Sequence, residues 1–505
     1  MTTPDMLTAA WNVPGFKWSR EKAAHLLNRT GFCAPPEAVE ALLRLSPQAA
    51  VAKVVDYEAE PAYVYPLEFD AYSHPVFGSP RRRRAFFQRF TPAERRKTLT
   101  RFFQASFEKM QEMRFWWLHR MIHTPRPLEE KLTLFWHGLF VSGFDMVHNA
   151  YHMYMQNNLF RTHAAGNIKT LTWQMAIDPA MLAYLNNNQN RKAHPNENFA
   201  RELMELFTMG IGNYTEEDVR QSARAWTGWT FFDDRAVFLA RQHDFGEKTF
   251  LGRTGRFNGR DILDIIFEQP ATPKHFATKL AIYFGNDEPP PQVISGLADC
   301  LKQNAWELKP TLKTLFSSQW FYSDAVVNNK VKSPAELIAG TLKLLGTSAP
   351  NPGAFLLSME LMGQMLFEAP NVGGWPTGKE WIDTGTLMAR YNMPALLVTG
   401  RYAARMPPRL RRILGEKCLR EFESPINPCA ELAARQIANT RDAVDFYLSR
   451  LIPHGIPADR RLDLIRFLNR NGSANARPLS AVGEEKFMLL SMLHLMLAEP
   501  RYQLC

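Results

Sequence analysis

Hydrophobic residues recur every three to four positions along most of the chain, a spacing typical of helices with one buried face. Ser19 can cap a first helix that ends near Gly31. The longest pattern of this kind covers residues 91–123, where Pro125 stops it. We therefore expect a mainly α protein, a large multi-helical globular fold with long loops.

Strand-like alternation of polar and apolar residues is sparse. Residues 230–259 carry few helix signals, and Asn258-Gly259 is a dipeptide that favours tight turns. We expect this segment to form a loop or one short hairpin. The sequence thus predicts at most a minor β-hairpin.

Two breaks rich in glycine and proline divide the helical pattern, one at residues 346–353 and one at Pro407-Pro408. They suggest four regions of the chain. These are an N-terminal helical region with a basic segment (1–127), a central helical region with the candidate site (128–346), a Gly/Pro/Trp-rich connecting segment (347–406) and a C-terminal helical subdomain (407–505).

Composition is that of an ordinary globular protein, with 46% hydrophobic and 22% charged residues in 505. The strongest apolar run, 487–498, is too short to cross a bilayer. Residues 1–17 lack the basic and apolar parts of a signal peptide, so we expect a cytoplasmic protein, or alternatively the mature form of an exported one. Five scattered cysteines without a CxxC pair argue against a disulfide framework and a zinc ribbon.

The net charge of +10 is concentrated in two basic segments, 81–101 and 409–420. Either they are solvated helix faces, or they bind an acidic protein partner or an anionic surface. Aromatic residues interleave with the arginines of the first segment, but at helical spacing they turn inward. Nucleic acid is therefore the least favoured partner, and no nucleic-acid-binding motif accompanies the charge.

The densest group of chemically capable side chains lies on a helix predicted at residues 196–205. At 100° per residue, Glu197, Arg201 and Glu205 share one stripe, with Glu202 about 60° away. The stripe is either a solvated face with ion pairs or one wall of a polar site. In a site, carboxylates act as metal ligands or as acid and base groups.

Two further segments can complete such a site. His243 and Asp244 lie in a predicted loop (243–248) with Lys248 nearby, and His137 lies on an apolar helix face, where a buried structural role competes with ligation. The leading hypothesis is a metal-dependent or acid/base enzyme, and the alternative is a non-catalytic scaffold that binds through the basic segments. The candidate catalytic residues are Glu202, Glu205, Arg201, His243 and Asp244, and the candidate ligands of a divalent zinc, iron or manganese ion are His137, Glu197, Glu202 and His243.

Motifs of nucleotide-binding loops, serine hydrolases and zinc proteases are missing. Several other segments instead carry a resemblance to one family. They are His25–Phe32, Glu130–Phe140, Asn196–Leu206 with Gly210–Thr215 and Thr227–Trp229, His243–Gly252, Pro370–Pro376 with Trp381-Ile382, and Glu499–Gln503. In order and spacing these segments resemble the bacterial family known as domain of unknown function 1800, from about residue 20 to 504.

The resemblance implies a helical fold and, for many relatives, export, but no established reaction. Three positions depart from the family pattern. Many relatives have histidine where this chain has Leu139 and Phe207, and Cys33 stands where glycine is usual. If those histidines are ligands in relatives, the resemblance implies that this chain binds metal differently or not at all.

Overall fold

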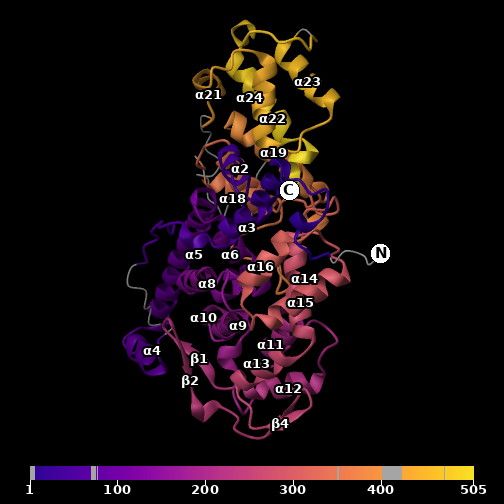
Figure 1. Cartoon of the computed structure of the whole chain (residues 1–505). Helices are drawn as coiled ribbons and strands as arrows, with labels where there is room; N and C mark the ends of the chain where they lie inside the picture. The colour runs from indigo at the N-terminus through magenta and orange to yellow at the C-terminus, as the bar shows by residue number, and fades with distance from the viewer. Residues whose placement is uncertain (1–5, 70–75, 77, 350–351, 401–423, 471) are drawn as a thin grey trace.

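The computed structural model describes residues 6–69, 76, 78–349, 352–400, 424–470 and 472–505, and Figure 1 shows that helices dominate them. The mainly α prediction is confirmed. The first half contains helices α1 (Arg20–Thr30), α2 (Pro36–Leu43), α3 (Pro47–Val55), α4 (Pro80–Phe87), α5 (Pro92–His123), α6 (Pro127–Leu139), α7 (Phe144–Val147), α8 (Ala150–Thr162), α9 (Ile168–Ala176), α10 (Pro179–Tyr184), α11 (Asn198–Glu202) and α12 (Glu216–Ala225). The second half contains α13 (Gly259–Glu268), α14 (Ala271–Phe284), α15 (Pro291–Gln303), α16 (Leu308–Ser317), α17 (Pro334–Leu344), α18 (Pro352–Leu361), α19 (Thr384–Thr399), α21 (Pro428–Ala434), α22 (Thr440–Leu451), α23 (Ala458–Asn469) and α24 (Glu485–Leu497).

Local capping explains where the predicted helices begin. The Ser19 hydroxyl accepts a hydrogen bond from the backbone N–H of Lys22 and starts α1. Thr91 and Glu94 form a reciprocal capping box at the start of α5, which continues unbroken for 32 residues. Both helices therefore start and end where local signals in the sequence placed them.

The β structure consists of two short antiparallel hairpins among the described residues, one more than predicted. Strand β1 (Trp229–Phe232) pairs with β2 (Arg235–Phe238), and β3 (Lys248–Phe250) pairs with β4 (Arg253–Gly255). Asn258-Gly259 is not a hairpin turn. The Asn258 side chain instead accepts hydrogen bonds from the N–H groups of Arg260 and Asp261 and caps α13.

Two hydrophobic clusters form the interior. One gathers α1 to α3, α9 and α13 to α16, and the other gathers α5, α17, α18 and the C-terminal helices α22 to α24. Helix α6 supplies side chains to both clusters, and residues 128–137 are all buried. In Figure 1 the C-terminal helices lie at one end of the molecule and the two hairpins at the other.

The basic segment 81–101 forms α4 and the first turns of α5, whereas the second basic segment, 409–420, lies outside the described residues. None of the helices in the described ranges is long and apolar enough to span a membrane. The four regions proposed from the sequence stay a prediction.

Candidate functional site

The predicted carboxylate site begins on α11 and continues into a π-helical segment, Leu203–Thr208. A π-helix widens the backbone by one residue per turn, is rare, and often occurs where a protein carries out its function. The Thr208 hydroxyl donates a hydrogen bond to the carbonyl oxygen of Leu203 five residues earlier, across this wider turn. The segment places Glu205 beyond Glu202 on the same half-buried surface.

Glu205 and Glu202 have different surroundings. The hydroxyl of Tyr214 donates a hydrogen bond to Glu205 Oε2 at 2.5 Å. Partial burial, followed by the negative charge of Glu205, raises the pKa of Glu202. Glu202 therefore keeps its proton to a higher pH than a solvated glutamate does.

Arg201 is held by two carboxylates. Its guanidinium donates to both carboxylate oxygens of Glu216 at 2.7 Å and to Glu197 at 3.4 Å. The pairing with Glu197 is the i,i+4 ion pair expected from the spacing, while Glu216 comes from the start of α12. An anionic ligand of Arg201 would have to displace Glu216.

The His243–Asp244 loop packs against the end of α12. His243 Nδ1 lies 2.8 Å from the Thr227 carbonyl oxygen, which only accepts hydrogen bonds, so Nδ1 carries the proton and Nε2 is the free acceptor. Burial lowers the pKa of His243. Burial works to raise the pKa of Asp244, but the hydrogen bond at 2.7 Å from Arg224 lowers it.

Lys248 completes this loop. Its side chain is buried, and its ammonium group donates to the carbonyl oxygens of Asp244 and Gly246 at 2.6 and 2.9 Å. These hydrogen bonds stabilise the loop, and a structural role of this kind agrees with the burial of Lys248.

His137 occupies an aromatic cage on α6. Its ring centroid lies 5.5 Å from those of Trp117 and Phe367, 6.1 Å from Phe160 and 5.3 Å from Trp375. Neither ring nitrogen has a hydrogen-bond partner among the described residues, and burial lowers the pKa of His137 to about 3. The imidazole is therefore neutral at physiological pH.

The structure brings some of the predicted residues together and leaves others in separate surroundings. Arg201 contacts Glu197, Glu202 interacts with Glu205, and His243 adjoins Asp244. His137 and His243 each contact their own aromatic neighbours. Within the described ranges, no group of three or more His, Cys, Asp or Glu side chains is arranged to hold a metal ion.

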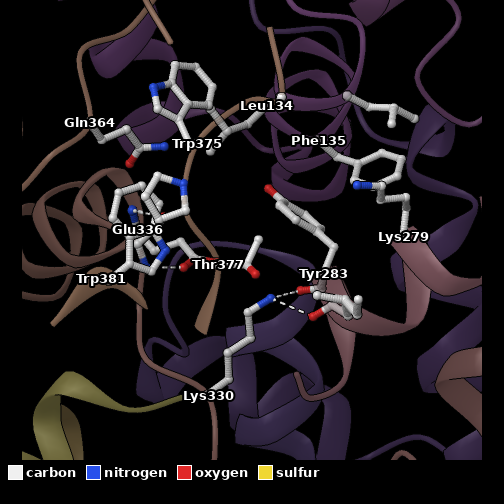
Figure 2. A pocket seen from close by; sticks show the side chains of 16 residues that line it. Leu134, Phe135, Lys279, Tyr283, Lys330, Glu336, Gln364, Trp375, Thr377 and Trp381 are labelled. Carbon is white, nitrogen blue, oxygen red and sulfur yellow. Dashed lines mark hydrogen bonds between the residues drawn. The ribbon is translucent and has the colours of Figure 1, made fainter. Parts of the chain in front are cut away.

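A cavity of about 150 Å³ lies elsewhere, between α6, α14 and the segment 373–381 (Figure 2). No motif or spacing in the sequence singles out its polar residues, which include Lys279, Lys330 and Glu336. A signal was nevertheless present, because the cavity is lined by parts of two segments that carry the family resemblance, 130–140 and 370–376. Leu139, one of the three departures from the family pattern, is among the lining residues.

The other two departures are also buried. Phe207 packs against Phe140 with ring centroids 5.8 Å apart. Cys33 is a free thiol, and burial raises its pKa to about 11, so it is a poor nucleophile.

Comparison with known proteins identifies the chain by family alone. Neither the curated proteins nor the solved structures include a significant match. Residues 25–504, nearly the whole chain, match the family model described as a protein of unknown function, DUF1800. The chain therefore belongs to the DUF1800 family.

Proposed function

We propose that the protein is an enzyme that uses acid/base chemistry at Glu202 and Glu205. The observation that supports this most is the unequal environment of two neighbouring carboxylates. Burial and repulsion raise the pKa of Glu202, and Tyr214 donates a hydrogen bond to Glu205. Neighbouring carboxylates in different surroundings are an arrangement by which one site supplies both an acid and a base.

In this proposal, Glu202 is the acid and Glu205 is the base. Tyr214 orients the carboxylate of Glu205. Arg201, fixed by Glu216 and Glu197, places a positive charge near Glu202. His243 and Asp244 lie at the opposite end of α12 from Glu216, where Asp244 pairs with Arg224, and they act there with His243 Nε2 as a separate proton acceptor.

A screen of small-molecule substrates tests the proposal. The purified protein is incubated with a defined mixture of metabolites, and loss of each compound is followed by mass spectrometry. We expect turnover that is lost at least 100-fold in Glu202→Gln, since one acid or base group contributes about 10²–10⁴ in rate. Glu217→Gln, on the exposed surface of α12, is the matched control. Turnover that survives in Glu202→Gln and Glu205→Gln would contradict the proposal.

The metal-dependent form of the hypothesis rests on His137, Glu197, Glu202 and His243. It requires these four side chains to lie around one ion. Each of them contacts different residues in the structure. Metal analysis by plasma mass spectrometry, on protein purified without an affinity tag or chelator, tests this form. Stoichiometric zinc, iron or manganese that is lost in His243→Ala would support it, and metal-free protein would leave acid/base chemistry alone.

A second candidate, a scaffold that binds an acidic partner, is favoured by the surface of α4 and the start of α5. Phe86, Phe87 and Phe90 pack on one another at 4.9–5.9 Å between ring centroids. The basic side chains around them are exposed, namely Arg81, Arg82, Arg83, Arg84, Arg89, Arg95, Arg96, Lys97 and Arg101.

Salt dependence tests this second candidate. Binding to immobilised polyglutamate should weaken strongly as ionic strength rises, because exposed charges are screened. Reversing Arg81, Arg83 and Arg84 to glutamate should abolish it, whereas reversing Arg241, outside the basic segment, should leave it. Binding that is independent of salt would count against the scaffold.

A further inference from the structure

We infer that the cavity beneath the segment 373–381 binds a small carboxylate that carries a single ring. The cavity is separate from the carboxylate site proposed above, and its lining combines aromatic walls with lysine ammonium groups. The lining includes Phe135, Lys279, Tyr283, Lys330, Gln364 and Trp375.

The size of the cavity sets the size of the ligand. Its volume is about 150 Å³, and an apolar protein cavity of that volume holds one benzene molecule. The rings of Phe135, Tyr283, Trp375 and Trp381 surround the space, as Figure 2 shows. Aromatic walls of this kind pack against a flat ring.

The charges of the lining residues indicate the charge of the ligand. Glu336 is the one acidic residue among the lining residues, and Lys131, just outside the cavity, already forms a buried ion pair with it. Lys330 and Lys279 are the lining cations, and neither forms a direct ion pair with a carboxylate of the described residues, although Lys330 interacts with the charge of Glu336. The excess is positive, so the cavity favours an anion.

Lys279 is the main residue that binds this anion. It comes from α14, is half-buried, and makes no hydrogen bond or ion pair with any described residue. Figure 2 shows its side chain among those that line the cavity. A half-buried cation has lost part of its hydration, and an incoming carboxylate offsets that loss.

Lys330 is the second cation of the lining. Its ammonium group donates to the carbonyl oxygens of Ile282 and Tyr283, and it lies 4.9 Å from the centre of the Tyr283 ring. An ammonium group has three N–H donors, so one donor is left for a ligand oxygen.

Gln364 supplies one further donor to the lining of the cavity. Gln364 is buried, and its Oε1 accepts from the N–H of Ala335, which leaves the amide NH₂ to a ligand. Unpaired buried donors are rare in folded proteins, and a carboxylate with its two acceptor oxygens satisfies donors of this kind.

The wall that carries Trp375 is fixed in place by a close backbone contact. Gly374 has φ of +97°, and a Cβ at this position would collide with the carbonyl oxygen of Gly138 on α6. Only glycine permits both the conformation and the approach. The cavity is thus a built feature of the fold that depends on a residue from each of the two resembling segments.

Isothermal titration calorimetry with matched ligands tests the inference. Benzoate, phenylacetate and cyclohexanecarboxylate are compared with benzamide, which has the same shape as benzoate without the charge, and with phenyl phosphate. We expect at least one of the carboxylates to bind at least tenfold more tightly than benzamide. In Lys279→Met, which keeps the apolar stem, that preference should fall to less than threefold. Lys274→Met, on the exposed face of the same helix, should keep it.

Each alternative result overturns the inference. Carboxylates that bind no better than benzamide would show that the lysines do not recognise the charge. Tighter binding of phenyl phosphate would assign the site to phosphorylated compounds. A preference that survives in Lys279→Met would place the anion elsewhere. Trp375→Leu removes an aromatic wall. If the ring of the ligand lies in this cavity, this variant should bind charged and neutral ligands more weakly to the same extent.

Discussion

Single buried side chains without partners stand out at the residue scale, and His137 is the simplest of them. Its neighbours are aromatic, and burial is the one cause that lowers its pKa. In the unfolded chain the ring takes up a proton at about pH 6.5, whereas in the folded protein it does so at about pH 3. Between these values the unfolded state binds more protons, so His137 lowers stability as pH falls.

Replacing His137 with phenylalanine should remove that dependence. We expect the free energy of unfolding of the wild type to fall relative to His137→Phe by about 1.4 kcal/mol per pH unit between pH 6 and 4. Any packing cost of the larger ring is the same at every pH, so the slope separates the two effects. Urea unfolding at several pH values measures it, with exposed His194→Gln as the control. Equal slopes would mean that His137 is protonated in the folded protein.

At the scale of elements, a buried ion-pair group joins three helices. Glu130 on α6 accepts hydrogen bonds from Arg120 on α5 at 2.7 Å, from Arg161 on α8 at 2.7 and 3.0 Å, and from Trp117 Nε1 at 3.0 Å. Burial works to raise the pKa of Glu130, but the two guanidinium groups lower it below its ordinary value. The carboxylate is therefore ionised, and it balances the charges of the Arg120 and Arg161 guanidinium groups.

Glu130→Gln should destabilise the protein by about 3–5 kcal/mol, because it leaves two buried guanidinium groups without their counter-charge. A combined variant, Glu130→Leu with Arg120→Met and Arg161→Met, should recover much of that loss, since no charge is then left unpaired. Chemical denaturation measures both. A combined variant less stable than Glu130→Gln alone would show that the group contributes through its geometry and not only through charge balance.

The sequence predicted these elements better than it predicted how they meet. Helix α5 has its own cap at Thr91 and its own stop at Pro125, so local signals sufficed. The Arg201–Glu197 pair also follows from spacing within one helix. Glu216, the closer partner of Arg201, comes from a different helix. The cavity likewise combines residues from distant segments, such as Lys279 and Lys330. Only tertiary packing determines which of them become neighbours.

The same limit applies to the candidate site. The amphipathic helix pattern predicted that Glu202 and Glu205 would share a surface, but the π-helix that spaces them has no signal in the hydrophobic pattern. Lysines such as Lys330 are ordinarily surface residues. Its burial among aromatic residues is decided by α14 and the segment 373–381, so it was not singled out from the sequence.

On the scale of the whole molecule, α6 couples the two hydrophobic clusters. Its apolar side chains enter both clusters. Its charged side chains also tie it to neighbouring helices, through Glu130 to α5 and through Lys131 to Glu336 on α17. A helix that is buried on every side in this way makes the stability of one cluster depend on the other.

Leu132→Ala, in the middle of α6, should therefore loosen both clusters at once. The residue is fully buried, and its truncation should cost about 2–5 kcal/mol. Hydrogen exchange followed by mass spectrometry should show faster exchange in α14 of the first cluster and in α17 of the second. Leu468→Ala, in α23 of the second cluster, is the control, and its effect should stay within α22 to α24. If Leu132→Ala accelerated exchange in α14 but left α17 unchanged, the clusters would unfold independently and α6 would not couple them.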